Sequence, residues 1–141
     1  FLIDKFIDVG IDGVSIGSND LTQLILGVDR DNAKISHEFD ERNEAVLNAI
    51  KHVIERCNDK GVTVSVCGQA PSVYPEFTEK LVEFGITSVS VNPDMIETVR
   101  EIVARSEKRL LLKITRKTLN KEEEGEDKEE GKEENVFGGE E

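Results

Sequence analysis

The sequence predicts an α/β fold in which parallel strands alternate with helices. Three segments, residues 10–16, 61–66 and 85–91, each open with glycine and end in a run of β-branched residues and serine. This composition is typical of short buried strands. Helical patterns fill the gaps between these segments, and an incomplete helix precedes the first. Such alternation implies right-handed crossovers and a parallel sheet.

The helices are expected after each predicted strand. In residues 41–60 apolar side chains recur at steps of three and four, the spacing of one helix face. These residues are Val46, Ala49, Ile50, Val53, Ile54 and Cys57. We predict Asp40 as the N-cap of this helix. A second helix is expected to begin near Pro75, and a third to follow Asn92 and Pro93, because proline suits the first helical position.

Three parallel strands are too few to close a barrel, and they leave edges that need covering. The pattern therefore leaves two architectures open. The chain forms either a small open sheet or the last three units of an eight-unit barrel.

The charge of the chain is concentrated at its end. Of the formal net charge of −12, residues 121–141 carry −8, from eleven acidic and three basic residues. We predict a globular region over residues 1–117 and a disordered acidic tail over 118–141, because the tail has few apolar residues to bury. A partner-binding tail is the alternative. The globular region is only mildly acidic, which indicates no nucleic-acid or anionic-membrane surface.

The sequence begins at Phe1, inside an apolar pattern, which indicates a piece of a longer protein. No signal peptide precedes it and no apolar run approaches the ~20 residues that cross a bilayer, so we expect a cytoplasmic location and no membrane partner. The two cysteines, Cys57 and Cys67, form no CxxC pair, and neither a zinc site nor a disulfide framework is indicated.

Polar residues follow each predicted strand, where parallel α/β folds collect their functional groups. The first strand is followed by Gly17, Ser18, Asn19 and Asp20. A hydroxyl, an amide and a carboxylate in this position suit an anionic ligand and a hard cation such as Mg²⁺. The alternative is that the three polar residues only cap a helical turn that starts at Leu21.

Cys67 ends the second predicted strand and is followed by a glycine. A thiol there could act as an acid or a base. The alternative is a small buried apolar residue, which is the interpretation we give to Cys57. His37 and His52 have no neighbouring constellation, and Asn92 is most simply an N-cap.

Two motifs resemble the barrel domain of the phosphoenolpyruvate-utilising enzymes, a family that includes phosphoenolpyruvate synthase, pyruvate phosphate dikinase and enzyme I of the sugar phosphotransferase system. The first motif is Ser-Ile-Gly-Ser-Asn-Asp-Leu-Thr-Gln over residues 15–23, with Asp29 and Arg30 shortly after it. The second is Cys-Gly-Gln-Ala-Pro-Ser over residues 67–72. This second motif is similar to the synthase branch, whereas the other two branches usually have an acidic residue in place of Gln69.

The resemblance implies a fold and a set of site residues. The fold is a TIM (β/α)₈ barrel, of which residues 1–117 form the last three units. Asp20 is similar to a Mg²⁺ ligand, and Gly17, Ser18 and Asn19 to residues that line the substrate carboxylate and the enolate oxygen. Arg30 resembles an arginine that contacts the phosphoryl group in some members. Cys67 resembles the thiol that exchanges a proton with the methyl or methylene carbon of the substrate.

The resemblance also implies an activity: formation of phosphoenolpyruvate from pyruvate, ATP and water through a phosphohistidine, with Mg²⁺ as cofactor. The nucleotide and phosphohistidine domains have no counterpart in this chain, so we expect it to be inactive alone. The family commonly forms homo-oligomers. The alternatives are the dikinase or enzyme I reaction, against which Gln69 argues, and a non-catalytic assembly module.

Overall fold

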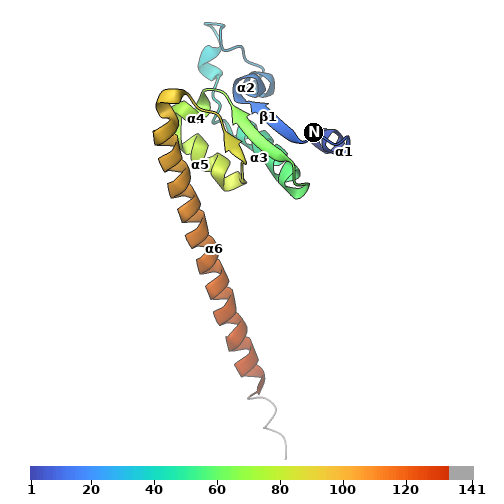
Figure 1. Cartoon of the computed structure of the whole chain (residues 1–141), viewed down its shortest axis with the longest axis vertical. Helices are drawn as coiled ribbons and strands as arrows, with labels where there is room; N and C mark the ends of the chain where they lie inside the picture. Colours follow the sequence, from blue (N-terminus) through green and yellow to red (C-terminus); the bar gives the residue numbers. More distant parts are fainter. Residues whose placement is uncertain (134–141) are drawn as a thin grey trace, which may run out of the picture. The chain divides into compact units, whose positions relative to one another are not determined.

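The computed structural model describes residues 1–133, and the chain divides into two compact units, Phe1–Ser106 and Glu107–Glu141. The first unit contains a three-stranded sheet with the order β1-β2-β3 (Figure 1). The strands are β1 (Gly13–Gly17), β2 (Thr63–Cys67) and β3 (Ser88–Val89), and all neighbours are parallel. The predicted α/β class and the parallel sheet are therefore confirmed.

The helices alternate with the strands as predicted. The bounds are α1 (Ile3–Asp8), α2 (Ser18–Leu26), α3 (Glu44–Asp59), α4 (Ala70–Val73), α5 (Pro75–Phe84) and α6 (Ile96–Glu133), with 3₁₀ turns η1 (Ser36–Glu38) and η2 (Pro93–Met95). Each strand begins two or three residues after its predicted glycine. Gly61 and Gly85 have φ values of +69° and +87°, so they close the preceding helices in the left-handed conformation, as expected for glycines that lie just before a strand.

The start of α3 differs from the prediction. The helix begins at Glu44, and the side-chain oxygen of Asn43 caps it by accepting a hydrogen bond of 2.9 Å from the backbone N–H of Ala45. Asp40 is not the cap, because its carboxylate accepts hydrogen bonds from Arg42. Asn92 occupies the predicted N-cap position before Pro93, although its side chain makes no capping bond.

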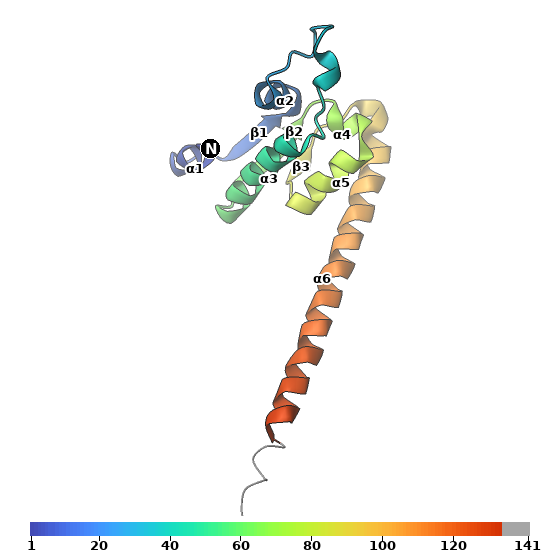
Figure 2. The ribbon, with the colours of Figure 1, turned by 180° about the vertical axis from the view of Figure 1, so that it is seen from behind.

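The core lies on one face of the sheet. Figures 1 and 2, seen from opposite sides, show α3 and α5 covering this face. The buried cluster comprises Ile7, Ile16, Val46, Ile50, Ile54, Cys57, Val64, Val66, Ala70, Phe77 and Leu81. Each large apolar side chain that is fully buried, such as Phe77 or Leu81, stabilises the unit by about 1.5–3 kcal/mol.

The opposite face of the sheet carries small side chains. A hollow beside the strands is lined by Gly13, Val14, Ser15, Thr63, Val64, Ser65 and Ser88. Alternation places the glycine, the serines and the threonine of this set on the open face, whereas the two valines belong to the core face. Because side chains alternate along a strand, Cys67 belongs to the same face as Thr63 and Ser65. The predicted thiol therefore lies on this face of the sheet, where the Ser15 hydroxyl contacts it.

The predicted disordered tail is not confirmed over residues 118–133, where the structure continues α6 as a helix through Glu133. Glutamate and lysine are good helix formers, and a helix that is already nucleated extends without a new nucleation cost. Residues 134–141 lie outside the described residues. The boundary between residues 117 and 118 stays a prediction, and α6 crosses it without a break. None of the helices described here is long and apolar enough to span a membrane.

Candidate functional site

The carboxyl ends of β1 and β2 lie side by side. The parallel register pairs Gly17 with Cys67, the last residue of each strand. Helix α2 follows β1 directly and begins at Ser18, with Gly17 at its N-cap position. Asn19 and Asp20 therefore belong to the first turn, and no side chain caps it, so the alternative of a capped turn starting at Leu21 is wrong.

The two strand ends touch at Gly68. Its φ of +144° is in the region that favours glycine, and an added Cβ would overlap the hydroxyl oxygen of Ser18. The same hydroxyl lies 3.3 Å from the backbone carbonyl of Cys67. The glycine after the cysteine therefore allows the first turn of α2 to pack against the exit of β2.

The Ser18 side chain is completely buried and points into the protein. Its hydroxyl donates to Oε1 of Glu41 at 2.5 Å, and its backbone carbonyl accepts a hydrogen bond of 2.7 Å from Thr22 Oγ1. The single hydroxyl proton is therefore directed to Glu41.

Asn19 joins Glu41 to Arg30. The amide orientation that pairs donors with acceptors places its nitrogen 2.9 Å from Glu41 Oε1 and its oxygen 3.2 Å from Arg30 Nη1. The backbone N–H of Arg30 donates to Gln23 Oε1 at 3.1 Å, which fixes the loop after α2. The structure thus brings the predicted Arg30 to the end of β1 alongside Asn19.

Asp20 is exposed in the first turn of α2, and its carboxylate lies over Gly17. Among the described residues no group of three or more histidine, cysteine, aspartate or glutamate side chains is arranged to hold a metal ion. A single hard carboxylate fits Mg²⁺, which is usually held by one or two carboxylates together with water and substrate oxygens.

Cys67 is partly buried, and the Ser15 hydroxyl donates to its sulfur at 3.5 Å. Sequence reasoning missed Ser15, although strand alternation places it on the same face as Gly17, the register partner of Cys67. Cys57 is completely buried, which confirms its assignment to the core, and burial raises the pKa of its thiol. His37 and His52 are exposed, as expected for residues outside the site.

Glu41 is the second residue that sequence reasoning missed. Only 4% of it is exposed, and burial raises the pKa of its carboxyl above the ordinary value, opposed by the hydrogen bond from Ser18. In the sequence it is one acid within a charged loop, and no local pattern distinguishes it from its exposed neighbours.

The motif that begins at Cys67 is held at its other end by the third strand exit. The backbone N–H of Asn92 donates to the buried Ser72 hydroxyl at 3.0 Å, and Thr78 Oγ1 donates to the Pro71 carbonyl at 3.1 Å. These bonds fix the short helix α4 between β3 and α5.

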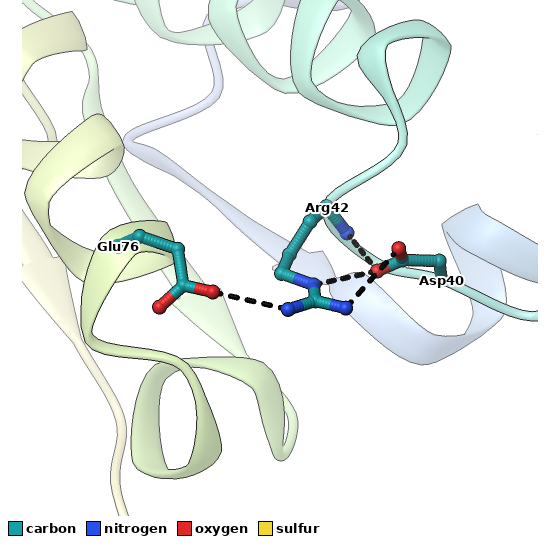
Figure 3. A network of polar contacts seen from close by, with 3 residues as sticks. All are labelled: Asp40, Arg42 and Glu76. Carbon is teal, nitrogen blue, oxygen red and sulfur yellow. Dashed lines mark hydrogen bonds and ion pairs between the residues drawn. The ribbon is translucent and has the colours of Figure 1, made fainter.

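A charged network fixes the loop before α3 (Figure 3). Nε of Arg42 donates to Asp40 Oδ1 at 2.9 Å, and its Nη1 donates to Glu76 Oε1 at 3.1 Å. The guanidinium also lies 4.3 Å above the ring centre of Tyr74. Residues 40–42, and with them Glu41, are therefore fastened to the start of α5.

We expect Arg42→Ala to lower the thermal unfolding midpoint of the full-length protein slightly at neutral pH, since exposed ion pairs contribute little. The hydrogen bond from Arg42 holds the pKa of Asp40 below its ordinary value of 3.8. The stability from this contact is therefore present above that value and disappears as the pH falls through the lower, folded value. Melting curves of both proteins should converge only on the acid side of pH 3.8.

Arg100→Ala is the control, because Arg100 is 75% exposed and forms a single ion pair of 3.5 Å with Glu97 on the same helix. A midpoint for Arg42→Ala equal to that of Arg100→Ala at every pH would show that the network does not fasten the loop.

Comparison with known proteins gives a consistent result. A family model described as PEP-utilising enzyme, PEP-binding domain, matches residues 1–108. The chain is 56% identical over 122 residues to a probable phosphoenolpyruvate synthase of Staphylothermus marinus, covering 85% of this chain and 14% of the relative. It is also 56% identical to the phosphoenolpyruvate synthases of Aeropyrum pernix over 115 residues and of Helicobacter pylori over 109 residues. These matches cover 79% and 77% of this chain, and 14% and 13% of those relatives. The chain thus spans about one seventh of the length of these relatives.

Proposed function

Because this chain belongs to the family of PEP-utilising enzymes through its PEP-binding domain, we propose that it is part of a phosphoenolpyruvate synthase. The whole enzyme forms phosphoenolpyruvate from pyruvate, ATP and water through a phosphohistidine, with AMP and phosphate as the other products. The observation that carries the proposal is the pairing of the two strand ends. It places the Cys67 thiol beside the turn that contains Asn19 and Asp20, with Arg30 held against Asn19.

The sheet forms the last three units of a (β/α)₈ barrel. Three parallel strands with helices on one face, and small side chains on the other, support this proposal. In a closed barrel the small-residue face would be the interior, and the carboxyl ends of the strands would form the active-site end.

The proposed reaction begins with removal of a methyl proton from pyruvate. The Cys67 thiolate takes the proton, so that a carbon–hydrogen bond breaks, a sulfur–hydrogen bond forms and the electron pair moves to the enolate oxygen. This oxygen then attacks the phosphorus atom of the phosphohistidine, so that an oxygen–phosphorus bond forms, the nitrogen–phosphorus bond breaks and its electron pair stays on the histidine nitrogen. Arg30, held by Asn19, offsets negative charge on the phosphoryl group as it moves. The reverse reaction returns the proton from Cys67 to the methylene carbon.

Asp20 is the residue of this chain that would hold Mg²⁺. When bound, the cation stabilises the charge on the substrate oxygens as a Lewis acid. Gly17, which leaves room for close approach, would line the substrate carboxylate and enolate oxygen together with Ser18 and Asn19.

We expect this chain alone not to turn over pyruvate and ATP, because neither a nucleotide site nor a phosphohistidine domain is part of the proposed barrel segment. The measurement is AMP formation by the purified chain. Turnover comparable to that of the full-length protein would contradict the proposal that ATP binding and histidine phosphorylation take place outside this segment.

The function is tested in the full-length protein by measuring pyruvate-dependent conversion of ATP to AMP without added phosphate. AMP formation under these conditions supports the synthase. A strict requirement for added phosphate would instead indicate the dikinase. Transfer to a carrier-protein histidine, without AMP formation, would indicate enzyme I.

A further inference from the structure

We propose that Glu41 is a positioning residue that holds the first turn of α2 in the arrangement required for the pyruvate half of the reaction. The inference rests on the proposed function and adds to it a residue outside both sequence motifs. It concerns the orientation of Ser18 and Asn19, and through Asn19 that of Arg30.

The burial of Glu41 requires an explanation. Glutamate is rarely buried, and a carboxylate removed from water loses solvation that its contacts must replace. Glu41 is 96% buried by residue surface, and its one bonded oxygen accepts from both Ser18 and Asn19. These two partners are neighbours in the predicted substrate-binding turn. The carboxylate is therefore directed at that turn and not at solvent.

The two hydrogen bonds determine what the turn can present to a ligand. The Ser18 hydroxyl has one proton, and it is donated to Glu41. The Asn19 amide donates its N–H to Glu41, which turns its oxygen toward Arg30 Nη1 at 3.2 Å. With the opposite amide orientation two donors would face each other at Arg30. By accepting the amide N–H, Glu41 therefore determines that the oxygen of Asn19, and not its nitrogen, faces the guanidinium of Arg30.

Glu41 also bears on the spacing between the two strand ends. The hydroxyl that it holds is the atom that occupies the space over Gly68, next to Cys67. Arg42 binds Asp40 and Glu76 and thereby holds the loop that carries Glu41 (Figure 3). The backbone of Glu41 is therefore fixed in position relative to the start of α5. A shift of the carboxylate would displace Ser18 and Asn19 together.

Because Glu41 is buried beneath Ser18 and Asn19, we assign it no contact with substrate. The proposal predicts that its hydrogen-bonding oxygen and its reach matter more than its charge. A glutamine retains an oxygen at the same distance from the backbone, whereas an aspartate retains the charge and is one methylene shorter. The two variants therefore separate positioning from electrostatics.

The experiment uses the full-length protein and compares Glu41→Ala, Glu41→Asp and Glu41→Gln. Two reactions are measured: pyruvate-dependent AMP formation, and phosphorylation of the enzyme's histidine by ATP in the absence of pyruvate. We expect Ala and Asp to lower kcat of the pyruvate reaction about 100-fold, the effect of a displacement near 1 Å, and to raise KM for pyruvate. Gln should lose less than about tenfold, because its oxygen can accept both bonds. Histidine phosphorylation should be unchanged in all three.

Glu38→Gln is the matched control, since Glu38 is on the same loop, is 68% exposed and contacts His37 alone among the ion pairs. It should behave as wild type in both reactions. The inference is overturned if Glu41→Ala and Glu41→Asp retain wild-type pyruvate turnover. It is also overturned if they lose both reactions equally, which indicates only a folding role, or if Glu41→Gln is as impaired as Glu41→Ala. A wild-type enzyme that makes no AMP from pyruvate and ATP would overturn the proposed function itself, and with it this inference.

Discussion

Gly68→Ala is expected to destabilise the full-length protein and to abolish most of its pyruvate-dependent turnover. At a φ of +144° an alanine is strained, which costs about 1–3 kcal/mol. The new methyl group would also overlap the Ser18 hydroxyl oxygen, which is buried and bound to Glu41 and has little room to move. Overpacking of this kind typically costs a further ~1–3 kcal/mol. Denaturant unfolding and steady-state turnover measure the two effects.

Gly61→Ala is the matched control for the strain. Gly61 also has a positive φ, of +69°, but an added Cβ there meets nothing within 4 Å. The difference between the two variants therefore reports the contact with Ser18 together with the greater backbone strain at a φ of +144°. If Gly68→Ala costs no more than Gly61→Ala, the close packing of the two strand ends is wrong.

Cys67→Ser is expected to lower kcat for pyruvate-dependent AMP formation by about 10²–10⁴-fold, the usual contribution of a positioned acid or base. A hydroxyl of nearly the same size keeps the packing but is a far weaker acid than a thiol near neutral pH. The measurement is initial rates at saturating pyruvate and ATP. Phosphorylation of the histidine by ATP alone should be unaffected.

Cys57→Ala is the control for Cys67→Ser. Cys57 is the other thiol of the chain, completely buried in the core on α3, where it has no access to a substrate. Its loss should reduce stability through a small cavity while leaving kcat near the wild-type value. Equal losses of kcat in the two variants would argue against a catalytic thiol.

Much of the fold could be predicted from the sequence because it depends on local patterns. The β-branched runs become strands, Pro75 begins α5, and the glycines before each strand close helices. The N-cap of α3 could not be predicted in this way. Asp40 and Asn43 are both good capping residues, and the choice between them depends on Arg42, which binds Asp40 and reaches Glu76, 34 residues away. Long-range contacts of this kind leave no local signal.

Part of the candidate site could likewise be predicted from local patterns, and part of it could not. The rule that functional groups follow the ends of parallel strands was enough to select the turn after β1 and Cys67. The parallel pairing of β1 with β2 brings this turn and Cys67 together. The inward direction of the Ser18 hydroxyl, and the buried Glu41 that receives it, could not be read from the sequence, because burial of a charged loop residue is decided by tertiary packing. The extension of α6 shows the reverse limitation: a composition typical of disorder also has high helix propensity.

The most direct test of the account is the exchange of pyruvate methyl protons with solvent, followed by NMR in D₂O during turnover by the full-length protein. The account predicts deuterium in the methyl group with the wild-type enzyme and with Cys57→Ala. It predicts none with Cys67→Ser, even though that variant still phosphorylates its histidine. Exchange by Cys67→Ser at the wild-type rate would contradict the proton-transfer role of Cys67 and the assignment of the strand ends as the pyruvate site.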